Sequence, residues 1–95
     1  MRDRIADFSD ADRAHLELIG KSLAEFGFGI FMPHKHDVEG KVVPLSLSEV
    51  SIERNLKVGF ASLDEVPSDV EAVGWRFADG RLQVFAGCCG NDGPP

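Results

Sequence analysis

Between residues 10 and 26, apolar residues recur at intervals of three and four positions, which is the spacing of a helix that buries one face. Ser9 is placed to cap the first turn, and Gly27 follows the last apolar residue as a left-handed stop. These signals predict an amphipathic helix over residues 10–26. Its buried arc would comprise Leu16, Ile19, Leu23 and Phe26, extended on one side by Leu18, Ala11 and His15, and its solvated arc Arg13, Glu17, Lys21 and Glu25.

Beyond the predicted helix the pattern changes to short apolar runs, which favour strands. Residues 28–32 predict a buried strand that Pro33 ends, because proline cannot donate to the ladder of a sheet. Residues 41–45 predict another strand, confined by Pro44 to a sheet edge. The intervening residues 33–40 are then a loop or an irregular edge.

Residues 50–60 alternate between apolar and polar side chains, and only Arg54 breaks the alternation. A hairpin that turns through Arg54-Asn55 keeps both arms in phase, and Asn55 tolerates the positive φ angle that such a turn requires. Residues 63–72 carry four acidic groups and no basic group, which indicates a solvated connection that includes one helical turn.

The strongest hairpin signal lies at Asp79-Gly80, a pair typical of two-residue type I′ turns. This turn sets the register of the two strands that flank it. Continued along the second strand, the register places Cys88 on one face of the sheet and Cys89 on the other. The predicted facing pairs are Ala78 with Arg81, Phe77 with Leu82, and Trp75 with Val84.

Together these elements predict one small α+β domain over residues 1–90, followed by a flexible C-terminal tail, residues 91–95. The N-terminal amphipathic helix packs on a mainly antiparallel sheet of five to six strands, which is either open or curled into a small barrel or roll. Residues 1–8 are expected to pack loosely, with Ile5 and Phe8 as their anchors.

Composition and charge narrow the classes of partner. The chain has 95 residues, of which 43% are hydrophobic, and a formal net charge of −6 with no cluster of basic residues. Nucleic acids and anionic membrane surfaces are bound by clustered lysine and arginine, so both are disfavoured as partners. The absence of a long apolar run predicts a soluble, cytoplasmic protein, in which Cys88 and Cys89 rest as thiols.

The densest chemistry of the sequence lies in residues 33–40, which contain two histidines and two carboxylates. In an extended segment His34 and His36 project to the same side, where two imidazoles provide half of a metal shell. We therefore consider a site for Zn²⁺ or another divalent transition metal, with His34, His36 and Glu39 as ligands. Further candidate ligands are Asp37, His15, Cys88 and Cys89.

The order Gly29, His34-x-His36, Glu39 resembles the first metal motif of the cupin family, in which a glycine precedes two histidines and a glutamate. The gaps before His34 and after His36 are each one residue shorter than in the family. The histidine of the family's second motif has no counterpart here. The resemblance implies a minimal β-barrel that holds a metal ion.

No nucleophile elbow, phosphate-binding loop or distinguishable pair of catalytic carboxylates is found. The first hypothesis is accordingly a non-enzymatic binding or protein-interaction module, with a protein partner or a second copy of the chain as its ligand. The alternative hypothesis is a divalent-metal-binding protein, including a metal-dependent enzyme, centred on His34 and His36. The sequence predicts no catalytic residue and requires no cofactor.

Overall fold

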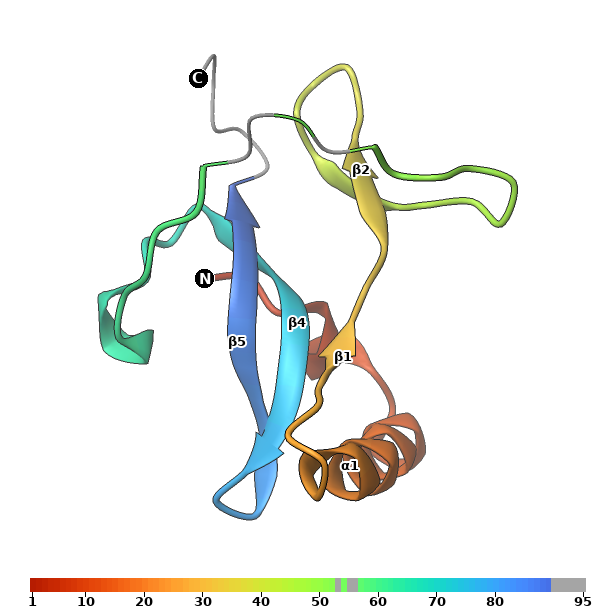
Figure 1. The fold of residues 1–95 in the computed structure, drawn as a ribbon, viewed down its shortest axis with the longest axis vertical. Helices are drawn as coiled ribbons and strands as arrows, with labels where there is room; N and C mark the ends of the chain where they lie inside the picture. Colours follow the sequence, from red (N-terminus) through yellow and green to blue (C-terminus); the bar gives the residue numbers. More distant parts are fainter. Residues whose placement is uncertain (53, 55–56, 90–95) are drawn as a thin grey trace.

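A computed structural model describes residues 1–52, 54 and 57–89 of the chain. One α-helix and two antiparallel sheets make up its α+β architecture (Figure 1), with strand orders β1-β4-β5 and β2-β3. The predicted class is therefore confirmed, but the five strands of the described part do not close into a barrel. The strands are β1 (Ile30–Phe31), β2 (His34–His36), β3 (Val42–Pro44), β4 (Val70–Ala78) and β5 (Arg81–Cys89).

The helix α1 (Asp10–Ala24) begins at the predicted residue and ends two residues before the predicted end. The Ser9 side chain accepts a hydrogen bond of 3.1 Å from the Asp12 backbone N–H. Gly27 has a φ angle of +76°, which a residue with a side chain rarely adopts. Among the described residues, no helix is both long and apolar enough to cross a membrane.

The buried side of α1 is centred on Gly20 and not on the predicted arc. A Cβ atom at Gly20 would lie 2.7 Å from Cδ2 of Leu82, so the helix backbone approaches the sheet most closely there. This contact sets the rotation of the helix, and Ile19 is 40% exposed. Phe26 lies beyond the last helical residue and is 73% exposed, so the predicted burial of this arc is wrong in part. The residues half-buried around Gly20 are Arg13, Leu16, Glu17, Leu23 and Ala24.

The β4–β5 hairpin has the predicted turn and register. Asp79 and Gly80 have φ angles of +54° and +82°, as a type I′ turn requires. The three predicted pairs around the turn are all present. Two register shifts between Ala72 and Trp75 interrupt the ladder further along, before it reaches Cys88. The buried apolar residues are Val42, Val70, Ala72, Val73 and Trp75, of which all but Val42 belong to β4.

Other strand predictions are corrected by the structure. The predicted buried strand over residues 28–32 shrinks to β1, whose Phe31 is 53% exposed. Residues 33–40, predicted to be a loop or an irregular edge, contain strand β2 of the two-stranded sheet, which agrees with the edge and not with the loop. Residues 50–52, 54 and 57–60 belong to no strand, while Asn55 of the predicted turn and the tail, residues 91–95, lie outside the described residues.

The N-terminal segment is tied to the sheet, so the expectation of loose packing is wrong. Arg2 forms a parallel bridge to β4, in which its N–H donates to Val70 (2.8 Å) and its carbonyl accepts from Ala72 (2.7 Å). The indole N–H of Trp75 donates to the Asp3 carboxylate at 3.1 Å. The short 3₁₀ helix η1 (Arg4–Asp7) follows and lies beside β4 in Figure 1.

Candidate metal centre

The β2–β3 hairpin places the two histidines on the same side of a strand. A carboxylate oxygen of Asp37 accepts hydrogen bonds from the backbone N–H groups of Glu39 and Lys41, both at 2.9 Å, and closes the turn. His34 and His36 then occupy alternate positions of β2. Their ring centroids are 5.7 Å apart, close enough for both rings to reach one ion.

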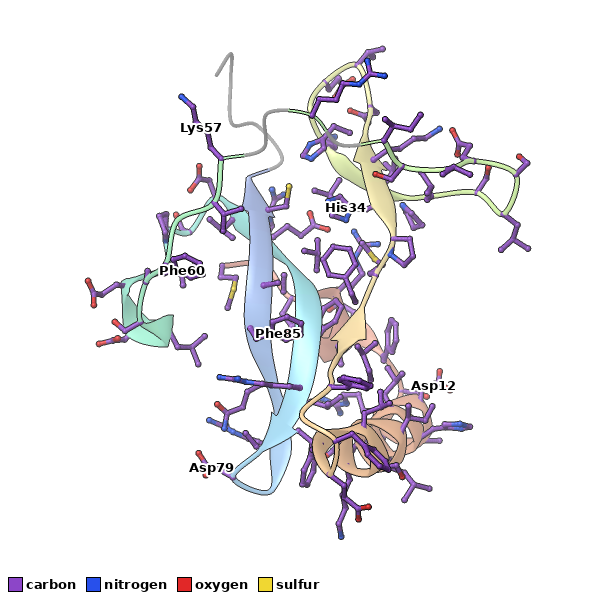
Figure 2. The ribbon with its side chains drawn as sticks, viewed as in Figure 1. Asp12, His34, Lys57, Phe60, Asp79 and Phe85 are labelled. Carbon is purple, nitrogen blue, oxygen red and sulfur yellow. The ribbon has the colours of Figure 1, made fainter. Side chains whose placement is uncertain are left out.

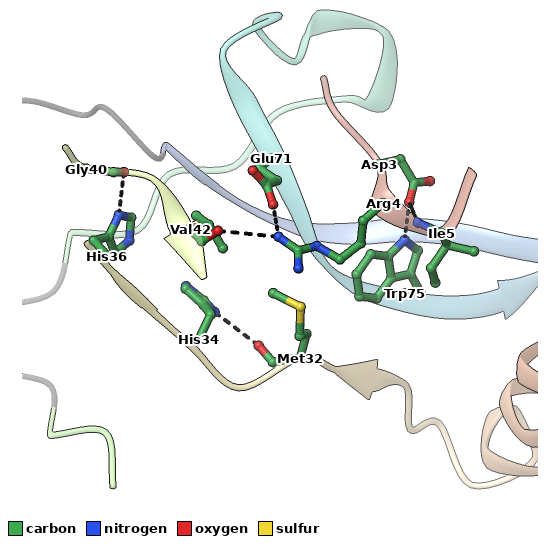
Figure 3. Close-up of polar contacts among 10 residues, drawn as sticks. All are labelled: Asp3, Arg4, Ile5, Met32, His34, His36, Gly40, Val42, Glu71 and Trp75. Atoms are coloured by element: carbon green, nitrogen blue, oxygen red, sulfur yellow. Dashed lines mark hydrogen bonds and ion pairs between the residues drawn. The ribbon is translucent and has the colours of Figure 1, made fainter. Parts of the chain in front are cut away.

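Backbone carbonyls orient both imidazoles. Nδ1 of His34 lies 3.1 Å from the carbonyl oxygen of Met32, and Nδ1 of His36 lies 3.1 Å from that of Gly40 (Figure 3). A carbonyl only accepts hydrogen bonds, so each Nδ1 carries a proton, and Nε2 is the nitrogen that a neutral ring offers to an ion. This outer hydrogen bond is the arrangement that metal-ligating histidines usually have.

Cys88, near the end of β5, is the third member of the group. Its Sγ atom lies 3.1 Å from Nε2 of His36, across 52 positions of the sequence. One ligand atom from each of His34, His36 and Cys88 lies within 4.8 Å of the others. In a tetrahedral zinc site, bonds of about 2.3 Å to sulfur and about 2.0 Å to nitrogen place these atoms about 3.5 Å apart. The three side chains therefore need only small movements to bind one ion.

The group lies where the two sheets meet. Figure 2 shows His34 at the end of the molecule opposite Asp79, which marks the turn of the β4–β5 hairpin. His34 and His36 come from the two-stranded sheet and Cys88 from the three-stranded one. The geometry of the group therefore depends on how the two sheets are held together.

Arg4 joins the two sheets near the histidines, with bonds to Val42 and Glu71 (Figure 3). Its Nη2 atom forms an ion pair with the carboxylate of Glu71 and lies 3.4 Å from the carbonyl oxygen of Val42. In the strand registers, Glu71 pairs with Cys88 and Val42 pairs with His36. One guanidinium group thus contacts the cross-strand neighbours of two of the three candidate ligands.

Three other predicted ligands, Glu39, Asp37 and His15, lie outside this group. Glu39 is exposed, and its carboxylate lies 3.5 Å from the ammonium group of Lys41. Asp37 closes the β2–β3 turn, and His15 is exposed on α1. Cys89 ends β5, and its side chain lies outside the described part of the structure. The structure thus brings together His34, His36 and one of the two cysteines.

All three candidate ligands line one open cavity of about 520 Å³. An ion pair between Lys35 and Glu49 closes part of its wall. Leu45 is held at the base of the hairpin, because its N–H donates to the carbonyl oxygen of Pro33 at 3.0 Å. The remaining lining residues are Val50, Ser51 and Ile52.

The pKa of Glu49 is lowered from its ordinary 4.5 to about 2, mainly by the hydrogen bond from Lys35 and then by hydrogen bonds from Ser46. Because the folded pKa is depressed, this interaction stabilises the fold above about pH 4.5 and is lost as the pH falls through about 2. We expect the Lys35→Gln substitution to raise the pKa of Glu49 towards 4.5, and a carbon-detected NMR titration measures this change. An unchanged pKa would show that Lys35 does not cause the shift.

Sequence reasoning missed Arg4 and Glu71. Arg4 stands in a segment of mixed polarity, and Glu71 in an acidic run that resembles a solvated connection. No local sequence pattern predicts that Arg4 and Glu71 form an ion pair, because the two residues are 67 positions apart. The chain matches no protein-family model, curated protein or solved structure among those compared, so the case for the site rests on its geometry.

Proposed function

We propose that this protein binds one divalent transition-metal ion, with Zn²⁺ as the first candidate, through His34, His36 and Cys88. The observation that supports the proposal is the convergence of one thiol and two imidazoles within 4.8 Å, from strands of two different sheets. Imidazole nitrogen and thiolate sulfur form a ligand set that favours zinc and its neighbours over magnesium or calcium.

The arrangement supports metal binding better than hydrolysis. Three protein ligands leave one position of a tetrahedral ion open, which is also the pattern of catalytic zinc sites. A general base that works near neutral pH has a pKa close to 7, however. Glu49, the carboxylate that lines the cavity, has a pKa of about 2 and is a poor proton acceptor.

Titration of the reduced, metal-stripped protein with Co²⁺ tests this proposal, because cobalt takes zinc sites and reports its ligands by absorption. We expect saturation at one ion per chain, with the intense visible bands of a four-coordinate ion and a near-ultraviolet band from thiolate-to-cobalt charge transfer. Cys88→Ser should lose the charge-transfer band, whereas the matched variant Cys89→Ser should keep it. A parent protein without this band, or its survival in Cys88→Ser, would contradict the proposal.

A protein-interaction role is the second candidate, and exposed aromatic side chains favour it. Phe26 and Phe28, which follow the last residue of α1, are 73% and 65% exposed. Phe60 is 96% exposed. Large apolar side chains at a surface commonly mark contact sites for other proteins. Such a role is compatible with a metal centre, since these residues do not line its cavity.

A further inference from the structure

We propose that the metal centre binds a small organic anion, whose donor atom takes the open coordination position and whose apolar body packs on Leu45, Val50 and Ile52. This inference rests on the proposed metal binding and adds the class of ligand that the site accepts. It follows from three properties of the cavity, which are its lining, its wall and its charge.

The lining combines metal donors with aliphatic side chains. His34, His36 and Cys88 line the same cavity as Leu45 and Ile52. Its volume of about 520 Å³ falls within the range of roughly 300–1,000 Å³ typical of small-molecule sites. A ligand bound to the metal is therefore next to an apolar surface that it can cover.

The wall that contains Val50 and Ile52 presents its apolar side chains to solvent. Val50 is 83% exposed and Ile52 is 75% exposed, so a bound ligand would remove apolar area from water on both sides of the contact. This wall is anchored to the hairpin by the Lys35–Glu49 ion pair. Its turn is closed by the Glu49 N–H, which donates to the carbonyl oxygen of Ser46 at 3.1 Å. The apolar surface is thus held beside the metal ligands.

The charge of the loaded site selects an anion. A divalent ion bound by one thiolate and two neutral imidazoles leaves about one positive charge. Lys35 and Glu49 cancel one another, because they form an ion pair at the cavity wall. A carboxylate or another anionic donor therefore gains an attraction that an ammonium group does not.

The visible spectrum of the Co²⁺-loaded protein measures ligand binding directly, with hexanoate, acetate and hexylammonium as probes. We expect hexanoate to shift the cobalt bands with a Kd about tenfold or more below that of acetate, because its four additional methylene groups cover Leu45, Val50 and Ile52. Hexylammonium should cause no shift. Equal Kd values for hexanoate and acetate, or a shift with hexylammonium, would overturn the inference.

Two matched variants test whether the aliphatic wall is responsible. Ile52→Ser should raise the Kd for hexanoate several-fold, with the Kd for acetate and the cobalt stoichiometry unchanged. Leu47→Ser is the control, because Leu47 is fully exposed and lies outside the cavity lining. An equal loss in both variants would overturn the ligand assignment alone. Failure of the parent protein to bind Co²⁺ would overturn the metal proposal as well.

Discussion

The double variant His34→Ala, His36→Ala is expected to lose more than about 100-fold in affinity for Zn²⁺, beyond what loss of an outer hydrogen-bond partner usually costs a metal site. It removes two of the three donors that the structure brings within 4.8 Å of one another. Cys88 alone then holds the ion weakly. Competition with a chromophoric chelator measures the affinity, and the metal content of untagged protein purified without chelator provides a second measurement.

The same measurements on Glu39→Gln provide the matched control. Glu39 belongs to the cupin-like spacing, but its carboxylate is exposed and lies beside Lys41, outside the group. We expect the affinity of this variant to equal that of the parent protein. Comparable losses in Glu39→Gln and in the double histidine variant would show that the ion binds on the turn and not at Cys88. Equal metal content in the parent protein and the double histidine variant would contradict the proposed metal site.

The second large effect concerns Arg4, which bonds to the strand neighbours of two candidate ligands. Arg4 joins Glu71 of β4 to the Val42 carbonyl of β3. Because Glu71 pairs with Cys88 of β5, loss of Arg4 is expected to loosen the approach of Cys88 to the β2–β3 hairpin. We expect Arg4→Met to lower the Zn²⁺ affinity by about tenfold, the low end of what a direct outer-shell partner causes, because Arg4 acts through the strand neighbours of the candidate ligands. The variant should also lose about 1–3 kcal/mol of unfolding free energy, because Glu71 keeps a largely buried charge without its partner.

The double variant Arg4→Met, Glu71→Met separates positioning from stability. Replacement of both members of a buried ion pair by apolar residues of similar size is often neutral for folding. Urea denaturation should therefore give an unfolding free energy near that of the parent protein, while the Zn²⁺ affinity stays low. Arg13→Met is the control, since Arg13 pairs with Asp10 on α1 and should change neither quantity appreciably. Recovery of the affinity in the double variant would show that Arg4 contributes only to stability.

Predictions from local signals agree with the structure where one short stretch contains all the information. The Ser9 cap and Gly27 mark the ends of α1 to within about two residues, because capping bonds join residues three to five positions apart. Asp79-Gly80 likewise sets the register of the hairpin around it. Two irregularities near Gly74 cancel each other, so the same register also pairs Glu71 with Cys88.

Predictions that needed the position of another element were less accurate. The apolar spacing of α1 indicates that one face packs on the sheet, but the rotation of the helix is set by the close approach of Gly20 to Leu82. The alternation in residues 50–60 favours a hairpin, yet its described residues form no strand. A strand with alternating apolar side chains forms only where another part of the protein covers its apolar face, and the alternation itself does not show whether such a surface exists.

The sequence by itself determined the α+β class, the approximate ends of the helix and the turn of the long hairpin. It also determined that His34 and His36 project from the same side of one strand. These features depend on contacts between near neighbours. Only the tertiary structure brings Cys88, and not Glu39, beside the two histidines as the third candidate donor. Only it joins Arg4 to Glu71 and to the Val42 carbonyl. Cys88 is 52 positions from His36, and Arg4 is 67 positions from Glu71. Such distant residues meet because two sheets pack together, and no local pattern encodes that arrangement.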